Sequence, residues 1–492
     1  MMYLGVDLGT SGVKLILMQA DGTVVASTSR QYPVSYPKPG WSEQNPDDWY
    51  TATMDGIRAL LEGQDPSQVR GIGVGGQMHG LVMLDSADQV IRPAILWNDG
   101  RTEEEVAYLN ETIGRSKLSA CTANIAFAGF TAPKILWVKK HEPDNYARIA
   151  KIMLPKDYLV YRMTGVHATD LSDASGTLLL DVAHRCWSKE MCEICGVNPA
   201  WLPRLFESYE AVGTLRPELQ QQLGLPQVIL AAGAGDNAAA AVGTGTVGDG
   251  ACNISLGTSG TVFISDSRFG VDDNNALHAF CHADGHWHLM GCMLSAASCV
   301  GWWMKILQSE DFDAEMAGLE DKLGKNNVLF LPYLMGERSP LNDVNARGTF
   351  TGMTMDTTRG DLMLAVLEGV AFGLRDSVEV ARKLGREIRT SKVCGGGAKN
   401  RLWLRILANV LNLDLELPAV EEGPSMGGAM LAAVACGEYP DVRAAADAIV
   451  RVRQTIHPEP ALVAAYEKRY RMFRKLYPAL KGSFAEMARM EE

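Results

Sequence analysis

Two copies of the sequence Gly-Thr-Ser-Gly, at residues 9–12 and 257–260, stand half a chain apart. Each copy lies between two runs of residues that are typical of β-strands. Such a turn leaves backbone amides and hydroxyl groups free to bind an anion, and glycine allows the anion to approach closely. Two such turns facing each other could hold successive phosphates of a nucleotide. A single copy would be interpreted as an ordinary hairpin turn.

Charged residues near these turns could complete a phosphoryl-transfer site. Asp7 stands just before the first turn, where its carboxylate could hold Mg²⁺ through water. Lys14 follows the same turn and could add a positive charge. Asp236 lies in a glycine-containing segment between a predicted strand and an alanine-rich helix. Its carboxylate could accept a proton from a substrate hydroxyl, or it could only cap the helix.

Three other patterns imitate known sites, and we favour a structural interpretation of each. The GxGxxG sequence at 243–248 follows a helix-like run, whereas a dinucleotide-binding fingerprint must follow a strand. The histidines between 278 and 288 fall on a predicted hairpin with few carboxylates nearby. Cys192 and Cys195 form a CxxC pair without the second pair that a zinc site needs.

The elements that must position these residues alternate between strands and helices. Three strands are predicted at 3–8, 13–18 and 23–28, with the first Gly-Thr-Ser-Gly turn between the first two. A helix opened by Asn45-Pro46 and a buried strand at 69–74 follow. This alternation predicts an α/β fold.

The repeated turn is part of a longer sequence repeat. Residues 7–12 read Asp-Leu-Gly-Thr-Ser-Gly, and residues 255–260 read Ser-Leu-Gly-Thr-Ser-Gly. A near-match of this length in the same strand-turn-strand context predicts two similarly built halves. The halves are not equivalent, because Asp7 of the first copy is replaced by Ser255 in the second.

Composition excludes several classes of protein. The chain has 492 residues, 47% of them hydrophobic and 21% charged, which is ordinary for a globular protein and excludes extensive disorder. The net charge of −12 argues against nucleic acid as a partner. No apolar run is long enough for a membrane span, and no signal peptide is apparent at the N-terminus. The ten scattered cysteines fit reduced thiols, so we expect a cytoplasmic protein.

Several long, spaced motifs resemble the FGGY carbohydrate kinases, in chain order and over nearly the full length. The matching stretches are Asp7–Thr10 for the first phosphate motif, Gly129–Trp137 and Gly348–Gly369 for the two family signatures, and Gly395–Ala398 with Trp403 for the adenosine motif. Within the family, further stretches are similar to members that phosphorylate D-xylulose. These are 76–80, 97–101, 154–159 and 336–340. The Gln-Met-His-Gly sequence of the first discriminates best, because these members hold the sugar with its Met and His.

The resemblance implies a fold of two actin-like (ribonuclease H-like) α/β domains with the active-site cleft between them. We expect domains at 1–247 and 248–454, with a C-terminal helix at about 455–492 that packs back on the first. The implied activity is ATP- and Mg²⁺-dependent phosphorylation of D-xylulose to D-xylulose 5-phosphate in D-xylose catabolism. A homodimer is also implied.

The resemblance also assigns roles to residues. Asp236 is implied as the proton acceptor, and Asp7 and Asp236 as the metal site. The implied sugar contacts are Met78, His79, Asp236, Asn237, Trp97 and Asp99, and the implied nucleotide contacts are Thr10, Ser11, Lys14, Gly257, Thr258, Gly396, Gly397, Ala398 and Asn400.

Some positions depart from the family pattern, and two other functions stay open. Asn409 and the segment 425–428 differ from what many relatives carry, which leaves the nucleotide affinity open. A kinase for another pentulose or a polyol would keep the phosphate motifs and change only the sugar pocket. An actin-like or chaperone-like ATPase would hydrolyse ATP without any sugar, but it would not need Met78, His79, Asp236 and Asn237.

Overall fold

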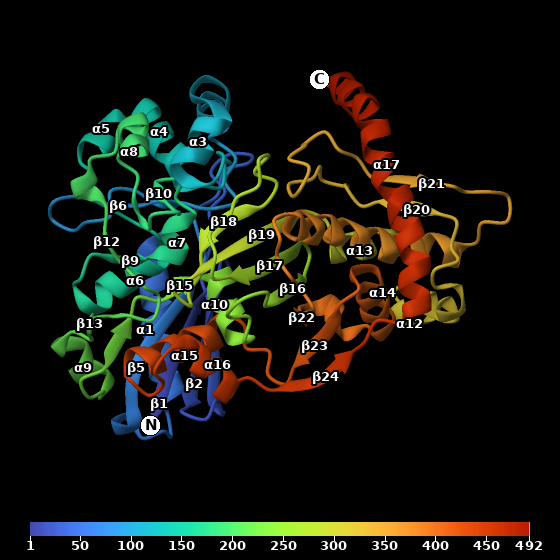
Figure 1. Ribbon diagram of the computed structural model, residues 1–492. Helices are drawn as coiled ribbons and strands as arrows, with labels where there is room; N and C mark the ends of the chain where they lie inside the picture. Colours follow the sequence, from blue (N-terminus) through green and yellow to red (C-terminus); the bar gives the residue numbers. More distant parts are fainter. Residues whose placement is uncertain (492) are drawn as a thin grey trace.

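Two seven-stranded sheets form the cores of the two halves of the chain, of which this computed structural model describes residues 1–491. The first sheet has the strand order β13–β14–β5–β1–β2–β3, with the short β15 beside β5 (Figure 1). Its strands are β1 (Met2–Leu8), β2 (Gly12–Gln19), β3 (Val24–Gln31), β5 (Val69–Gly76), β13 (Ala211–Thr214), β14 (Ile229–Ala231) and β15 (Ala234–Gly235). The three N-terminal strands and the strand at 69–74 were all predicted from the sequence.

The second sheet repeats this topology. Its order is β18–β19–β17–β16–β22–β23–β24. The strands are β16 (Cys252–Leu256), β17 (Gly260–Asp266), β18 (His278–Cys281), β19 (Trp287–Met293), β22 (Thr390–Cys394), β23 (Asp414–Pro418) and β24 (Val452–Ile456). β1 is antiparallel to β2 and parallel to β5, just as β16 is antiparallel to β17 and parallel to β22. The two Gly-Thr-Ser-Gly turns therefore occupy equivalent places, which confirms the predicted duplication.

The first sheet is covered on both faces. Alternate residues of β1 point to opposite sides, so that Leu4, Val6 and Leu8 join one hydrophobic cluster with α1 (Pro46–Leu61), while Tyr3 joins another with α15 (Pro424–Ala435). Asn45 caps α1, as its sequence predicted. The approach of α15 is very close, because a Cβ on Gly5 would lie 1.9 Å from the carbonyl oxygen of Ser425.

The segment that returns to the first half is α15 together with α16 (Val442–Ile449), not the C-terminal helix. Figure 1 shows both, in orange-red, beside β1, β2 and β5. Residues 425–428, which depart from the family pattern, therefore lie against the first sheet and outside the nucleotide cavity described below. Gly428 of this segment allows α15 to contact the glycine-rich strand β5 at Gly73.

The prediction that the C-terminal helix packs on the first half is wrong. α17 (Pro460–Glu491) lies against α13 (Arg359–Lys383) and α14 (Arg401–Leu411) of the second half. Tyr466 and Arg469 bind the buried carboxylate of Glu368, at 3.0 and 2.6 Å, and the aromatic rings of Tyr470 and Phe473 contact Phe372. A buried carboxylate and an aromatic cluster thus fix the helix there. Within residues 1–491, neither α17 nor any other helix has the length and apolarity to cross a membrane.

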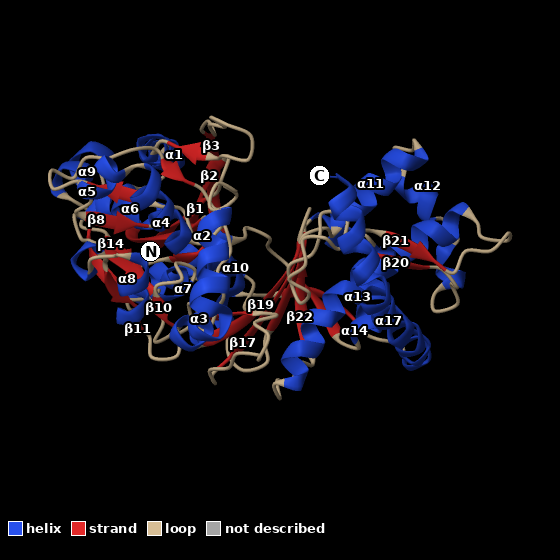
Figure 2. Ribbon diagram, turned by 90° about the horizontal axis from the view of Figure 1, so that it is seen from above, coloured by secondary structure: helices blue, strands red, loops and turns tan. Residues whose placement is uncertain are grey.

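The two halves meet along β17, β18 and β19, and Figure 2 shows β17 and β19 beside the helices of the first half. The backbone amide of Cys281 on β18 donates to Ser175 Oγ in α7 (Leu171–Ser175), at 2.9 Å. The side chain of Asn275 donates to Ser119 in α3 (Arg115–Thr122), at 3.0 Å. These contacts bring the edge of the second sheet beside the first half.

Shorter elements are inserted between the strands of both sheets. The remaining helices are α2 (Glu103–Ala107), α4 (Thr131–His141), α5 (Pro143–Ala147), α6 (Pro155–Thr164), α8 (Lys189–Cys195), α9 (Pro217–Leu223), α10 (Asp236–Gly243), α11 (Ala297–Leu307) and α12 (Phe312–Met316). The remaining strands are β4 (Glu43–Gln44), β6 (Val82–Leu84), β7 (Ala94–Ile95), β8 (Lys151–Met153), β9 (Ala168–Asp170), β10 (Leu180–Asp181), β11 (Cys186–Trp187), β12 (Arg204–Phe206), β20 (Leu329–Leu331) and β21 (Thr349–Thr351).

Candidate active site

Two aspartates meet at one edge of the first sheet. Asp7, near the end of β1, stands beside Gly75 of β5, and Ala234 of β15 also pairs with Gly75. All three strands are parallel there, so their carboxyl ends lie at the same edge. Asp236 begins α10 directly after β15. Asp7 and Asp236 are therefore brought together from segments more than 200 residues apart.

The surroundings of these carboxyl groups favour their protonated forms. Burial and the negative charge of Asp236 raise the pKa of Asp7 to about 7, against an opposing effect of Lys14. Burial raises the pKa of Asp236 to about 6, although the backbone amide and side-chain amide of Asn237 donate to its Oδ1 at 2.7 and 3.0 Å. Two half-buried carboxylates that repel each other make a donor set suited to a hard divalent cation such as Mg²⁺.

Met78 and His79 form a turn just after β5, and Met78 packs against Gly235, the residue before Asp236. Met78 is buried, and a Cβ on Gly235 would lie 2.9 Å from its sulfur. His79 has a left-handed backbone (φ 69°), and its Nδ1 lies 2.9 Å from the carbonyl oxygen of Gly176. Burial, assisted by the positive charge of Lys134, holds the pKa of His79 well below its ordinary value. The imidazole is therefore neutral and can exchange hydrogen bonds with a sugar hydroxyl.

Two residues that support this turn were missed in the sequence. Thr131 Oγ1 and Lys134 Nζ both donate to the carbonyl oxygen of His79, at 3.0 and 3.1 Å. Both belong to the first family signature, and that match was the only signal that could have drawn attention to them. Lys134 is fully buried, and burial lowers its pKa to about 7.

Trp97 and Asp99 lie in one loop but have different surroundings. Trp97 is 44% exposed, and its indole N–H donates to Thr10 Oγ1 at 2.9 Å, so it touches the first phosphate turn. Asp99 is only 1% exposed. Its carboxylate accepts hydrogen bonds from the guanidinium of Arg101 at 2.6 and 2.8 Å and from the backbone amide of Ser42 at 2.6 Å. The structure thus brings Trp97 to the site and leaves Asp99 facing the protein interior, where it holds the loop.

The two phosphate turns present their hydroxyl residues at the surface of the site. Ser11 and Thr258 are exposed and Thr10 is half-buried. The carbonyl oxygen of Thr258 accepts hydrogen bonds from the backbone amides of Ala296 and Ser298, at 3.0 and 3.2 Å. These bonds to the start of α11 hold the second turn in place. Lys14 lies 2.6 Å from Glu422, so its charge is shared with a carboxylate.

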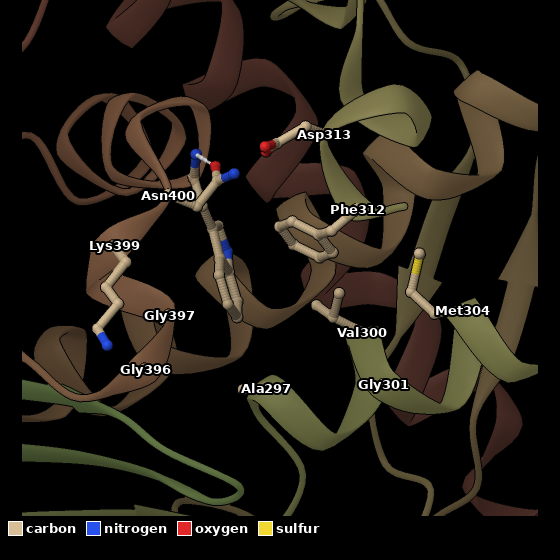
Figure 3. A pocket seen from close by; sticks show the side chains of 11 residues that line it. Ala297, Val300, Gly301, Met304, Phe312, Asp313, Gly396, Gly397, Lys399 and Asn400 are labelled. Atoms are coloured by element: carbon tan, nitrogen blue, oxygen red, sulfur yellow. Dashed lines mark hydrogen bonds between the residues drawn. The ribbon is translucent and has the colours of Figure 1, made fainter. Parts of the chain in front are cut away.

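A cavity of about 360 Å³ lies in the second half between α11, α12 and the start of α14 (Figure 3). Gly396, Gly397 and Asn400 line it, as predicted for the nucleotide, whereas Ala398 is buried beside it. A Cβ on Gly397 would lie 2.7 Å from the ring of Trp403, so only glycine fits there. Asn400 Oδ1 accepts the backbone amide of Trp403 at 2.8 Å and caps α14.

The opposite wall of this cavity was not predicted. It is formed by Ala297, Val300, Gly301, Met304, Phe312 and Asp313 (Figure 3). These residues are small or apolar apart from Asp313, and they carry no recognisable motif. Only the packing of α11 and α12 opposite the glycine-rich segment brings them to the site.

A buried charge cluster lies beneath the site. The ammonium of Lys156 is 2.6 Å from Asp157 and 2.8 Å from Asp170, and all three side chains are buried. Asp170 accepts a hydrogen bond from Ser172 Oγ at 2.5 Å, and Ser172 Oγ accepts the backbone amide of Gly235 at 3.2 Å. This chain of contacts ends at the residue before Asp236. The stretch 154–159 had been noted only for its resemblance to relatives.

Comparison with known proteins is consistent over the whole chain. The models for the N-terminal and C-terminal domains of the FGGY family of carbohydrate kinases match residues 2–243 and 252–436. A xylulose kinase of Escherichia coli (strain K12) is 42% identical, over 97% of this chain and 99% of that protein. A xylulose kinase of Bacillus subtilis (strain 168) is 38% identical over 97% of each. A solved structure described as a xyloylose kinase from Brucella ovis is 42% identical and has a TM-score of 0.94, covering 98% of this chain and 100% of that one.

Proposed function

The chain belongs to the FGGY family of carbohydrate kinases, and from this premise we propose that it transfers the γ-phosphoryl group of ATP to O5 of D-xylulose. The products are D-xylulose 5-phosphate and ADP, and the reaction is a step of D-xylose catabolism. The observation that carries the proposal is the position of Asp236, which stands beside the Met78–His79 turn and close to Asp7. Relatives at 42% and 38% identity that bear the name xylulose kinase support the choice of sugar.

Asp236 is the proton acceptor in this proposal. Its carboxylate orients the O5 hydroxyl, with Asn237 holding one of its oxygens, and takes the proton as the new P–O bond forms. Because burial raises its pKa to about 6, Asp236 is a stronger base than an exposed aspartate and is still largely ionised at neutral pH. Met78, His79 and Trp97 bind the sugar, and Asp99 holds the loop that carries Trp97.

The nucleotide binds mainly to the second half. The cavity lined by Gly396, Gly397 and Asn400 takes the adenosine, with Ala398 behind it. The turns at Thr10–Ser11 and Gly257–Thr258 hold the phosphates with backbone amides and hydroxyl groups, and Lys14 adds positive charge. Phosphoryl transfer depends mainly on such alignment and charge neutralisation.

Asp7 and Asp236 are the residues that would hold Mg²⁺, directly or through water. Their half-buried, mutually repelling carboxylates fit a divalent cation. When bound with ATP, the ion neutralises charge on the phosphate oxygens. A cytoplasmic homodimer completes the proposal and is supported by the family resemblance alone; light scattering of the purified protein measures the assembly.

The experiment that tests the proposal is an assay of ADP release with Mg-ATP and a panel of sugars. The panel contains D-xylulose, D-ribulose, L-ribulose, L-xylulose, glycerol and gluconate. We expect kcat/KM to be highest for D-xylulose. A clear preference for another sugar would keep the phosphate site and refute the choice of substrate. ATP hydrolysis that is independent of every sugar would refute kinase activity.

A further inference from the structure

A loop of the second half, after β20, carries an arginine toward the first half. Glu337 anchors this loop, because its buried carboxylate accepts the backbone amides of Leu294 and Arg338 at 2.9 and 2.8 Å. The backbone amide of Ser339 donates to the carbonyl oxygen of Cys292 on β19 at 3.0 Å. The backbone of Arg338 is therefore fixed beside the end of the strand that faces the first half.

The guanidinium of Arg338 crosses the boundary between the halves. Its Cζ lies 5.3 Å from the ring centroid of Phe127, which belongs to the first half. The ring of Phe127 contacts that of Phe130 at 5.5 Å, and Phe130 contacts the imidazole of His79 at 4.9 Å. Arg338 thus stands at the end of a row of rings that leads to the sugar-binding turn.

The positive charge of Arg338 also influences the pKa values of two residues near the proposed sugar site, His79 and Cys292. Burial is the main cause of the lowered pKa of His79, and the positive charge of Arg338 contributes to it. Burial raises the pKa of the Cys292 thiol, while Arg338 lowers it and Asp236 raises it. The Cys292 thiol is therefore close enough to both Arg338 and Asp236 to sense their charges.

Arg338 differs from the other cations around the site because it forms no ion pair within residues 1–491; its side chain interacts with the ring of Phe127 and the Cys292 thiol, and its charge acts on the neighbouring Glu337. Lys14 lies against Glu422, Arg101 against Asp99, and Lys156 within its aspartate cluster. Among residues 1–491, no carboxylate oxygen lies within 4.0 Å of the Arg338 guanidinium, which is half-buried. A guanidinium has five N–H donors and loses free energy when they are withdrawn from water without acceptors. A ligand that is rich in oxygen atoms would supply those acceptors.

We propose that Arg338 is a substrate-binding residue, which donates hydrogen bonds to oxygen atoms of the sugar beside His79. The proposal rests on the proposed function, since it takes the sugar to lie between His79 and Asp236. Arg338 comes from the nucleotide-binding half, so the sugar would touch both halves at once. Sugar binding would then favour approach of the two halves.

The test compares Arg338→Met and Arg338→Lys with a matched control, Arg389→Met. Arg389 is an exposed arginine of the same half and pairs with Glu387 at the surface. Steady-state assays give KM for D-xylulose, KM for Mg-ATP and kcat separately. Quenching of tryptophan fluorescence by D-xylulose, without ATP, measures sugar binding directly. Thermal unfolding checks that each variant is folded.

We expect Arg338→Met to raise KM and the dissociation constant for D-xylulose at least about tenfold, as for loss of hydrogen bonds to a charged group. Arg338→Lys should lose less, and KM for Mg-ATP should change less than twofold in both. Arg389→Met should behave as wild type.

Unchanged sugar binding in Arg338→Met would overturn the proposal. A lower kcat with unchanged sugar binding would also overturn it, because that result would indicate that Arg338 acts on the transferred phosphoryl group and not on the sugar. Wild-type turnover in the same assay tests the proposed function independently. If another sugar of the panel is the substrate, the comparison is made with that sugar.

Discussion

The chemistry of the site depends on where individual carboxyl groups lie. An exposed aspartate is a weak base at neutral pH, since its pKa is near 3.9. Burial at the start of α10 raises the pKa of Asp236 to about 6, and the two hydrogen bonds from Asn237 keep its carboxylate oriented. Asp7 lies at the same edge of the sheet, and burial and the charge of Asp236 raise its pKa to about 7. Position thus makes Asp236 a better proton acceptor than its residue type alone would.

The pH dependence of turnover should report this environment. Asp236 accepts the proton only when it is ionised, so kcat/KM for D-xylulose should be maximal above its pKa and should fall as the pH drops through about 6. Asp236→Asn should lower kcat by about 10²–10⁴-fold at every pH, with Mg-ATP binding largely retained.

The measurements are a pH–rate profile from pH 5 to 8 and calorimetric titration with nucleotide. Asn237→Ala is a second useful variant. It removes one hydrogen bond to the Asp236 carboxylate, which holds the pKa down, so its acidic limb should move to higher pH. Near-normal turnover by Asp236→Asn would refute the role of Asp236.

Among the elements, α15 shows how glycines determine the distance between a helix and the strand and helix that it packs against. A Cβ on Gly73 would lie 2.0 Å from the carbonyl oxygen of Gly428, and one on Gly427 would lie 1.8 Å from that of Ala239. These contacts involve backbone atoms, which cannot rotate away as a side-chain end can. The helix can therefore lie this close to β5 and α10 only because glycine stands at these contact positions.

Gly73→Ala should therefore destabilise the protein by about 1–3 kcal/mol or more, because the backbone of α15 must move. The control is Gly482→Ala in α17, where a Cβ meets nothing within 4 Å. Removing a glycine from the exposed helix interior should stabilise it by about 0.5–1 kcal/mol. Urea denaturation measures both changes. Equal stability of the two variants would contradict the packing argument.

The Lys156 cluster gives a second prediction at this scale. Lys156→Met would leave Asp157, Asp170 and Asp173 buried without their cation, so we expect a loss of about 3–5 kcal/mol of stability. Lys151→Met is the matched control, because Lys151 pairs with Asp88 at the surface, where an ion pair contributes about 0–1 kcal/mol.

Urea denaturation at pH 7 compares these two lysine variants. A similar small loss in both would show that the buried cluster does not depend on its lysine. Retained stability of Lys156→Met with lower kcat would assign the cluster a purely positioning role, through Ser172 and Gly235.

At the scale of the whole molecule, each half supplies part of the site. Asp7, Asp236 and the sugar-binding turn belong to the first half, and the nucleotide cavity belongs to the second. Phosphoryl transfer needs both substrates in line, and closure of the halves would also exclude water. The two halves meet along β17–β19, while α15 and α16 return the chain to the first half.

We therefore expect the molecule to become more compact when both substrates are bound. Small-angle X-ray scattering should show a smaller radius of gyration with D-xylulose and a non-hydrolysable ATP analogue together than without ligands. Sugar alone should give part of this change. The same radius in all conditions would contradict closure as a step of the reaction.

Much of this molecule can be read from its sequence, because the signals are local. Strand and helix patterns follow from the alternation of side chains, and the turn at 9–12 and its copy at 257–260 predict the duplicated topology. The first strands, the cap of α1 and the glycines of the nucleotide cavity were all predicted. Each of these features depends on a few neighbouring residues and the geometry of the backbone.

Contacts between distant segments were decided only by the tertiary structure. The sequence shows that α17 is amphipathic but not which half it covers, and that depends on the buried Glu368 and the rings around Phe372. Likewise, Asp99 turns inward where its carboxylate accepts the backbone amide of the distant Ser42, and the apolar wall of the nucleotide cavity carries no motif. Burial, ion pairing and the meeting of α11 with α14 arise only when remote parts of the chain come together. For that reason the sequence identifies the chemical groups, and the fold determines which of them can act together.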